Sequence, residues 1–351
     1  MSNSKIEWTE RTWNPIVGCS VRSPGCTHCY AMPIAHRLGA NPATPHYAGL
    51  TQMTKGGAVF TGKVACAPDS TWLEPLKRKK PTVYFVNSMG DLFHENVPDA
   101  WIDRAFATMA LCPQHIFQVL TKRDERMRAY MADVEREARW MNEVAVLFER
   151  ESWLTKRCHS ILGRREPWLP LPNVWLGVST ERQKEADERI PNLLRTPAAV
   201  RFISAEPLLE AIDLTNHCNG HYFFDSLRGA RWHDDPDHAN PQQKFAPGLD
   251  WVIVGGESGR GARPMHPDWA CSLRDQCAAA GVAFFFKQWG EFTTETVSGT
   301  NVDLKYDLKP NQCVAWGDGK TNHTRYTRVG KKHAGRKLDG MEHNAMPERA
   351  A

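Results

Sequence analysis

A series of short apolar runs, each followed by polar residues, constrains the fold of this chain more than any other feature. The runs are rich in β-branched and aromatic residues, as is typical of strands that are buried on both faces of a sheet. Amphipathic helical patterns separate them, and this alternation of strand and helix predicts a parallel sheet. The runs occupy residues 83–88, 116–121, 174–179, 200–204, 251–255 and 282–287.

A further strand is expected at residues 13–17, which brings the total to about seven, a number that fits an incomplete or complete α/β barrel and also an open doubly wound sheet. The helices between the strands carry recognisable end signals. An apolar stripe lies within residues 98–113, and a helix from Pro267 is expected to stop at Gly281. Thr180, with Gln183 three residues later, predicts a capping box for another helix.

Two insertions interrupt the alternation, at residues 124–170 and 216–248. Apolar side chains at helical spacing as far as about residue 153 predict one long amphipathic helix in the first, with a packing role. We expect residues 1–295 to form an α/β barrel domain that contains both insertions, and residues 296–351 to form a C-terminal extension. The composition of the second insertion suits a solvated loop better than a zinc site, because its histidines, cysteine and aspartates follow no known zinc spacing: His217, Cys218, His221, His233, Asp234, Asp235, Asp237 and His238.

Three cysteines near the N-terminus, Cys19, Cys26 and Cys29, form the clearest chemical motif. Three thiolates can hold a [4Fe-4S] cluster by three of its irons and leave the fourth iron open, whereas a structural zinc site takes four protein ligands. The triplet therefore predicts a metal centre with an open position. Six of the other cysteines are isolated and are expected to be small buried hydrophobes: Cys66, Cys112, Cys158, Cys271, Cys277 and Cys313.

Composition limits the class of protein. The 44 lysines and arginines exceed the 40 acidic residues by only four, so charge alone does not indicate a nucleic-acid partner. No run approaches the roughly 18 apolar residues that a membrane span needs, and the segment Met-Ser-Asn-Ser-Lys lacks the apolar stretch that we would expect of a signal peptide. Ten cysteines in 351 residues are too few for a disulfide scaffold. We therefore expect a cytoplasmic protein with reduced thiols and no membrane partner.

Polar residues follow each predicted strand, where parallel α/β folds place their sites. Donors and charges recur at all six of these ends, which favours a polar site that could hold a charged ligand of about the size of adenosine. The glycine-rich segment at residues 255–259 lacks the spacing of a dinucleotide fingerprint, and the chain contains no phosphate loop ending in Gly-Lys-Ser/Thr. Nicotinamide and nucleoside-triphosphate chemistry are therefore disfavoured.

Several segments together resemble an uncharacterised bacteriophage and prophage protein family, which in turn resembles the radical S-adenosylmethionine (SAM) superfamily. The resemblance covers nearly all of the chain outside the insertions. It implies a partial (β/α)6-type barrel, a [4Fe-4S] cluster held by three cysteines after the first strand, and SAM bound to the fourth iron. The segments are Trp13-Asn14-Pro15, the three cysteines, and residues 87–93, 120–123, 177–179, 204–208, 255–259 and 331–336.

The resemblance assigns roles position by position. Cys26 and Cys29 keep the spacing of the superfamily, whereas six residues separate Cys19 from Cys26 where three are usual. A tight turn at Ser23-Pro24-Gly25 is expected to draw in this longer loop. The implied SAM contacts are Ser88, Met89, Gly90, Asp91, Ser179 and Ser204, and the implied catalytic or substrate contacts are Lys122, Glu206 and Glu257.

Three functional classes follow. The first is a radical SAM enzyme that draws its electron from a reductant such as flavodoxin or ferredoxin and modifies an unknown substrate, with a nucleobase or nucleic acid as the candidate. The second is a non-catalytic zinc or iron-sulfur protein in which His28 or His36 closes the site. The third is a nucleic-acid-binding protein that uses residues 77–80 and Lys331-Lys332, although a solvated loop explains the first of these basic runs better.

Overall fold

A computed structural model describes residues 4–163, 169–218, 223–232, 243–244, 246–298, 312–317 and 322–348. The chain divides into two compact units. Unit 1 comprises Met1–Ser179, Glu188–Phe202 and Glu348–Ala351, and unit 2 comprises Thr180–Asp187 and Ile203–Pro347. The domain and extension bounds expected from the sequence stay a prediction.

The central feature is a parallel α/β sheet, as the apolar runs predicted. Within the described residues, seven strands follow one another in the order β1-β6-β7-β8-β9-β14-β15. This is the sheet of a partial barrel, so the predicted fold class is confirmed. The strands are β1 (Arg11–Trp13), β6 (Val83–Val86), β7 (Ile116–Thr121), β8 (Val174–Ser179), β9 (Val200–Ala205), β14 (Trp251–Gly255) and β15 (Ala283–Gln288).

Burial explains why these segments form strands. All residues of β6, β8 and β14 are buried, which is the environment that continuous apolar runs require. Parallel pairing is in register from Arg11 opposite Tyr84 in β1 and β6 to Thr121 opposite Val178 in β7 and β8. The carboxyl ends of β6 and β7 therefore lie side by side.

The expected strand at residues 13–17 is two strands. β1 ends at Trp13, and Ile16–Val17 forms β2, which pairs antiparallel with β5 (Ala65–Cys66) instead of joining the central sheet. Pro15 lies between them and has no backbone N–H to donate to a ladder, so the strand cannot continue through it. The break sends the chain toward the cysteines.

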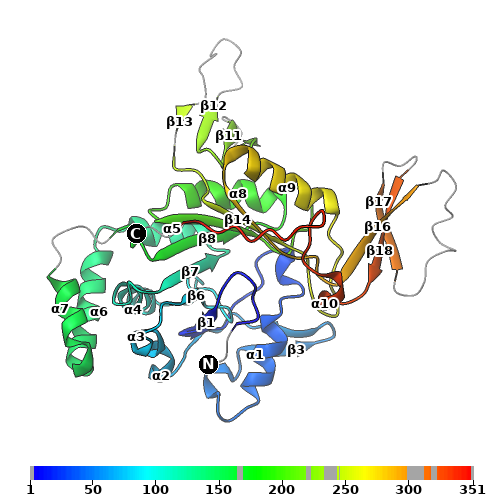
Figure 1. Cartoon of the computed structure of the whole chain (residues 1–351). Helices are drawn as coiled ribbons and strands as arrows, with labels where there is room; N and C mark the ends of the chain where they lie inside the picture. The colour runs from blue at the N-terminus through cyan, green and yellow to red at the C-terminus, as the bar shows by residue number, and fades with distance from the viewer. Residues whose placement is uncertain are drawn as a thin grey trace. The chain divides into compact units, whose positions relative to one another are not determined.

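Helices of unit 1 follow its strands, and Figure 1 shows α6 and α7 lying side by side next to α4. The single long helix expected from Asp124 is wrong, because α5 ends at Ala132 and α6 begins at Arg136. Asp133 adopts extended backbone there, and its carboxylate accepts a hydrogen bond from the Glu135 N–H at 2.9 Å. The helices of this unit are α1 (Ala31–Gly39), α2 (Asp69–Trp72), α3 (Glu74–Lys77), α4 (Asp99–Ala110), α5 (Asp124–Ala132), α6 (Arg136–Arg150) and α7 (Thr155–Leu162), with the short turns η1 (Pro24–Cys26), η2 (Pro45–Tyr47) and η3 (Ser152–Leu154).

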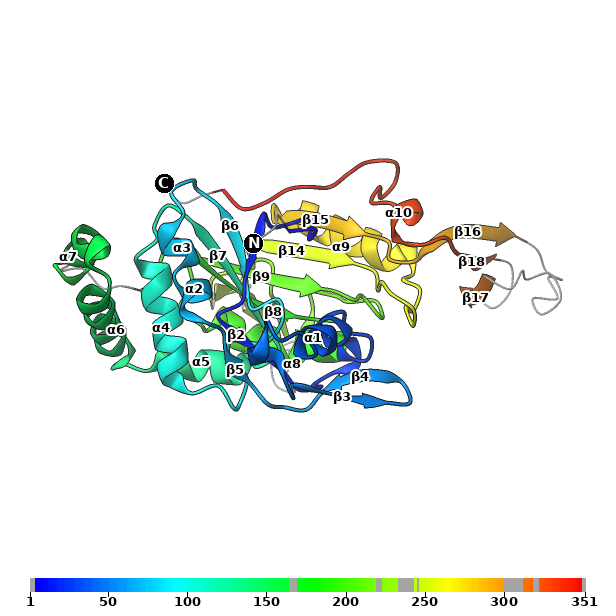
Figure 2. The same ribbon diagram turned by 90° about the horizontal axis from the view of Figure 1, so that it is seen from below.

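A β-hairpin, β3 (Thr51–Thr54) with β4 (Gly57–Phe60), packs beside α1 in the same unit, as both views show (Figures 1 and 2). Together with η2 they bury an apolar cluster that includes Met32, Tyr47 and Phe60. This cluster forms a wall against which two of the three cysteines pack.

In unit 2, α9 (Pro267–Ala280) follows β14 and contacts both β14 and β15. Gly281 has φ +69° and caps this helix in the left-handed conformation, as the sequence predicted. Small antiparallel sheets complete the described part of the unit, and one of them continues from the end of β15 (Figure 1). These elements are β10 (His217–Cys218), β11 (Phe223–Asp225), β12 (Ala230–Trp232), β13 (Gln243–Lys244), β16 (Phe292–Ser298), β17 (Gln312–Gly317), β18 (Asn322–Arg328) and α10 (Lys331–Ala334).

The capping box expected at Thr180 is wrong. Helix α8 (Gln183–Leu194) does begin where the sequence indicated, but the Gln183 N–H donates to Glu210 Oε1 at 2.8 Å. Thr180 instead donates its backbone N–H to the carbonyl of Ser204. The carboxylate of Glu210, distant in sequence, therefore caps the helix in place of the Thr180 side chain.

Candidate metal and cofactor site

The three cysteines follow β2 within one stretch of unit 1. Cys19 lies two residues after the strand, Cys26 is the last residue of the turn η1, and Cys29 lies two residues before the start of α1. The Cys26 N–H donates to the Ser23 carbonyl at 2.9 Å, which forms the predicted tight turn at Ser23-Pro24-Gly25. The long first gap between the cysteines is therefore taken up by a hydrogen-bonded turn.

The position of Cys19 depends on a close backbone contact between Gly18 and Gly90. The Gly18 N–H donates to the Met89 carbonyl at 3.0 Å, and the two glycines form a parallel bridge. A Cβ on Gly90 would lie 2.9 Å from the Gly18 oxygen, and one on Gly18 would lie 2.2 Å from the Lys63 oxygen. Only glycine allows the chain before Cys19 to approach the end of β6 this closely.

The sulfur atoms lie between apolar packing and hydrogen-bond donors. Cys19 and Cys29 pack against the apolar cluster of α1, η2 and the β3–β4 hairpin. Cys26 is buried, and its sulfur accepts from the Arg22 N–H at 3.5 Å with the Ser23 hydroxyl at 3.9 Å. This mixture of low polarity and amide donors suits sulfur ligands that must carry negative charge.

The charges of the three thiols act on one another. Burial and the negative charges of Asp91, Cys29 and Cys26 together raise the pKa of Cys19 to about 12, although the charge of Arg123 opposes them. Burial also raises the pKa of Cys29. The pKa of Cys26 is lowered overall, because the charge of Lys122 and the hydrogen bonds from Arg22 and Ser23 outweigh the effect of burial.

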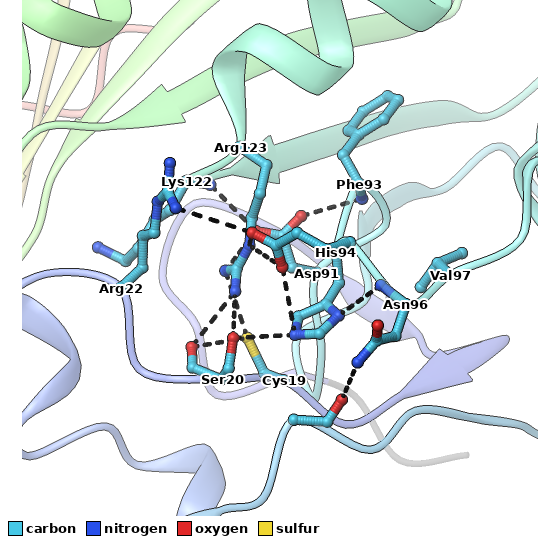
Figure 3. Close-up of polar contacts among 12 residues, drawn as sticks. Cys19, Ser20, Arg22, Asp91, Phe93, His94, Asn96, Val97, Lys122 and Arg123 are labelled. Carbon is cyan, nitrogen blue, oxygen red and sulfur yellow. Dashed lines mark hydrogen bonds and ion pairs between the residues drawn. The ribbon is translucent and has the colours of Figure 1, made fainter.

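Two cations follow β7 and face the thiols. The ammonium nitrogen of Lys122 is buried, and burial lowers the pKa of this side chain to about 8, although the charges of Cys26 and Cys29 partly offset the effect. Arg123 is 4% exposed and donates from Nη1 to the Cys19 sulfur at 3.5 Å (Figure 3). The end of β7 thus brings positive charge to all three cysteines.

Asp91 joins the end of β6 to the end of β7. Its carboxylate accepts a hydrogen bond from the Thr121 hydroxyl at 2.7 Å. It also accepts from the Lys122 N–H and the Phe93 N–H, each at 3.0 Å (Figure 3). Arg123 Nη1 lies 3.3 Å from Asp91 Oδ2. The carboxylate expected to contact SAM therefore orders the strand ends that carry the cations.

The other residues expected to contact SAM after β6 lie beside the chain that leads to the cysteines. Asn14 Oδ1 accepts from the Ser88 hydroxyl and from the Met89 N–H, each at 3.1 Å. The Tyr30 hydroxyl, next to Cys29, donates to the Ser88 carbonyl at 3.0 Å. Residues 88–91 and the cysteine loop thus form one site in unit 1. Ser179 lies at the end of β8 in the same unit, where its carbonyl accepts from Arg189 at 2.8 Å.

The remaining predicted residues lie in unit 2. Glu206 accepts from the Ser204 hydroxyl at 3.0 Å and pairs with Lys287 at 2.9 Å. Glu257 is buried, and both of its oxygens bind the Arg263 guanidinium, at 2.8 and 2.6 Å. Glu206 and Ser204 form a small polar cluster, whereas the bidentate pair of Glu257 is typical of a structural anchor.

The His/Asp-rich insertion yields one described histidine with defined contacts. His217 is fully buried, with Nδ1 2.7 Å from Asp187 Oδ1 and Nε2 3.1 Å from Ser226 Oγ. His221, His233, Asp234, Asp235, Asp237 and His238 lie outside the described residues. Among the residues that the structure describes, no three His, Cys, Asp or Glu side chains are arranged to hold one metal ion.

Comparison with known proteins assigns the chain to a family. The sequence pattern of a family described as "Protein of unknown function (DUF5131)" matches residues 3–347. The chain belongs to the DUF5131 family. No curated protein matches this DUF5131 chain. Among solved structures, a cysteine-to-serine mutant of spore photoproduct lyase is similar to it, with 10% identity, a TM-score of 0.33, and coverage of 93% of this chain and 69% of that one.

Sequence reasoning about this DUF5131 chain missed three residues of the site: Asn14, Ser20 and Arg123. Arg123 was visible as a charge after a strand, but its contact with Cys19 spans 104 positions. Asn14 belongs to a segment that carries the family resemblance and Ser20 lies within the cysteine motif, but neither position indicated a contact with the site. The helices in the described part of the chain are not long and apolar enough to cross a bilayer.

Proposed function

We propose that this chain is a radical SAM-type iron-sulfur enzyme that cleaves SAM and modifies a substrate still to be identified. The observation that carries the proposal is the gathering of Cys19, Cys26 and Cys29 in one site of unit 1, faced by the cations of Lys122 and Arg123. One buried and two partly buried thiols in one stretch of chain, with no disulfide among them, suit a metal centre better than a packed core.

The donor set fits a [4Fe-4S] cluster in three respects. A four-iron cluster takes one thiolate per iron, so its three cysteine ligands need not converge on a single point. Amide and guanidinium donors reach two of the sulfurs, and such donors are what tune a cluster. Apolar side chains cover Cys19 and Cys29, which limits access of water and oxygen.

When bound, such a cluster would supply the one electron, drawn from a reductant, for cleavage of SAM to methionine and a 5′-deoxyadenosyl radical, which would take a hydrogen atom from the substrate. The chain's own residues bind and orient the participants. Cys19, Cys26 and Cys29 hold the metal, while Lys122 and Arg123 offset the negative charge of the thiolates. Residues 88–91 place backbone groups beside the cysteine loop, where the amino group of SAM could be held.

Substrate and partners form the outer part of the proposal. A flavodoxin or ferredoxin would supply the electron, and a nucleobase or nucleic acid is the substrate class we favour from the resemblance to phage and prophage proteins. In unit 2, Glu206 with Lys287 and Ser204 offers a charged and hydrogen-bonding cluster at the carboxyl ends of β9 and β15. Parallel α/β folds hold their ligands at such ends.

Anaerobic reconstitution with iron and sulfide tests the proposal. We expect four irons per chain, and 5′-deoxyadenosine released from SAM under dithionite at a rate above that of the Cys29→Ala variant. One zinc per chain with no cleavage of SAM would contradict the proposal and favour the non-catalytic zinc protein. Four irons with SAM left intact would restrict the chain to a non-catalytic iron-sulfur protein.

A further inference from the structure

The guanidinium of Arg123 is held at all three of its nitrogens. Nε lies 3.3 Å from both carboxylate oxygens of Glu95, and Nη2 donates to the Ser20 hydroxyl at 2.7 Å. Nη1 is shared between Asp91 Oδ2 at 3.3 Å and the sulfur of Cys19 at 3.5 Å (Figure 3). With 4% of the residue exposed, this orientation is fixed.

The sulfur is the unusual partner in this set. A buried arginine is satisfied by carboxylates, and Asp91 and Glu95 already supply two. A neutral thiol is a weak acceptor, whereas a metal-bound thiolate carries the charge that a guanidinium donor recognises. The contact therefore makes chemical sense when Cys19 is a metal ligand.

The charge balance around Cys19 supports the same conclusion. The Asp91 carboxylate and the Cys19 sulfur share the same guanidinium nitrogen, Arg123 Nη1, so a negative charge lies beside the sulfur. Arg123 is the cation that touches both groups, with Nη1 3.5 Å from the Cys19 sulfur and 3.3 Å from Asp91 Oδ2. Without Arg123, the Cys19 thiolate would face an uncompensated carboxylate.

We propose that Arg123 is a positioning residue that holds the Cys19 thiolate through Nη1 and sets the reduction potential of the metal centre. Net charge and hydrogen bonds to the sulfurs are among the factors that set the potential of such a centre. A donated hydrogen bond and a positive charge both favour the reduced, more negative state, so their loss lowers the potential. The inference rests on the proposed iron-sulfur centre and adds to it a residue that the three-cysteine motif does not contain.

The test is a redox titration of the iron-loaded full chain, without SAM, followed by electron paramagnetic resonance. Arg123→Met is compared with Arg126→Met, because Arg126 donates to the carbonyls of His94 and Val97, pairs with Asp99 and, within the described residues, donates to no sulfur. We expect the equilibrium constant for reduction to fall about tenfold in Arg123→Met, which is about 59 mV for one electron. Arg123→Lys keeps the positive charge and loses the planar set of guanidinium donors, so its reduction potential should lie between those of Arg123→Met and wild type. The reduction potential of the control variant, Arg126→Met, should equal that of wild type.

An unchanged potential in an Arg123→Met protein that keeps its iron would overturn the inference. If that variant loses its fold, Ser20→Ala decides, because it removes the 2.7 Å contact that steers Nη2 and leaves the ion pairs in place. A smaller shift in the same direction is expected there, and no shift would overturn the inference. If wild type binds zinc and no iron, the proposed function fails separately. The role of Arg123 would then predict zinc affinity about tenfold weaker in Arg123→Met than in Arg126→Met, and equal affinities would contradict it.

Discussion

The carboxylate of Asp91 and the guanidinium of Arg123 form a buried ion pair beside Cys19, with 3.3 Å between Oδ2 and Nη1 and both side chains at most 6% exposed. The pair links the end of β6 to the residues after β7. Its carboxylate also holds the Thr121 hydroxyl and the Lys122 N–H. One acidic residue thus fixes both cations that face the thiols.

Replacing Asp91 with Asn is expected to destabilise the protein by about 3 kcal/mol or more, because a buried arginine then loses its fully buried counter-charge. Chemical denaturation of the metal-free protein measures this free energy of unfolding. Asp99→Asn is the matched control, since Asp99 is 60% exposed and pairs with Arg126 at the surface. A change of under 1 kcal/mol in Asp91→Asn would show that the pair does not hold the strand ends together.

Gly18→Ala is expected to disturb the metal site through the backbone. Gly18 has φ +98°, and an added Cβ would lie 2.2 Å from the Lys63 carbonyl oxygen. Gly49→Ala is the control, since Gly49 also has positive φ (+72°) but its Cβ would meet nothing within 4 Å. Left-handed strain costs each variant about 1–2 kcal/mol, and only Gly18→Ala should also lose iron. Equal iron content in the two variants would refute the close-approach explanation.

The central strands and the metal motif could be predicted from the sequence because both are local patterns. The apolar composition of runs such as Val83–Val86 is enough to predict that they are buried. The three cysteines are recognisable as a motif because they lie within eleven residues, from Cys19 to Cys29. Breaks within an element were harder to see. Pro15 and Asp133 each interrupt a periodicity that continues on both sides, so the pattern alone favoured one strand and one long helix.

Residues that act on the motif from a distance could not be predicted in the same way. Arg123 reaches Cys19, and Asn14 reaches Ser88, across 104 and 74 positions of the chain. Such contacts depend on which strand ends become neighbours. The order of the strands in the sheet cannot be predicted from a short stretch of sequence. Glu210 is a further example, because its carboxylate accepts the hydrogen bond from the first N–H of α8 that Thr180 was expected to accept.

Lowered pKa values of buried histidines predict loss of stability in acid. His115 is fully buried, and burial lowers its pKa, with Nε2 3.0 Å from the Pro75 carbonyl. The unfolded state therefore binds a proton more readily than the folded state, so the free energy of unfolding should fall as the pH drops below about 6.5. The pKa values of His46 and His94 are lowered as well and add to the same trend.

Urea denaturation at pH 7.5 and pH 5.5 measures this dependence. His115→Gln should flatten the slope between the two pH values, while substitution of the exposed His333 by Gln should leave it unchanged. A slope that is the same in wild type and His115→Gln would rule out His115 as its source.

The two predicted acidic residues of unit 2 should separate into structural and functional roles. Glu257→Gln is expected to cost about 2 kcal/mol of stability, because the Glu257 side chain is 5% exposed and holds a bidentate arginine that is itself partly exposed. Glu206→Gln should change thermal stability little and lower the turnover of SAM. The opposite pattern, a stable Glu257→Gln protein with no turnover, would return Glu257 to the list of catalytic candidates.

The central claim is that Cys19, Cys26 and Cys29 together hold an iron-sulfur centre. Iron content of Cys26→Ala after anaerobic reconstitution tests it most directly, with Cys112→Ala as the control because Cys112 is fully buried elsewhere in the same unit. We predict about four irons per chain in wild type and in Cys112→Ala, and less than about one in Cys26→Ala. An unchanged four irons in Cys26→Ala would contradict the account.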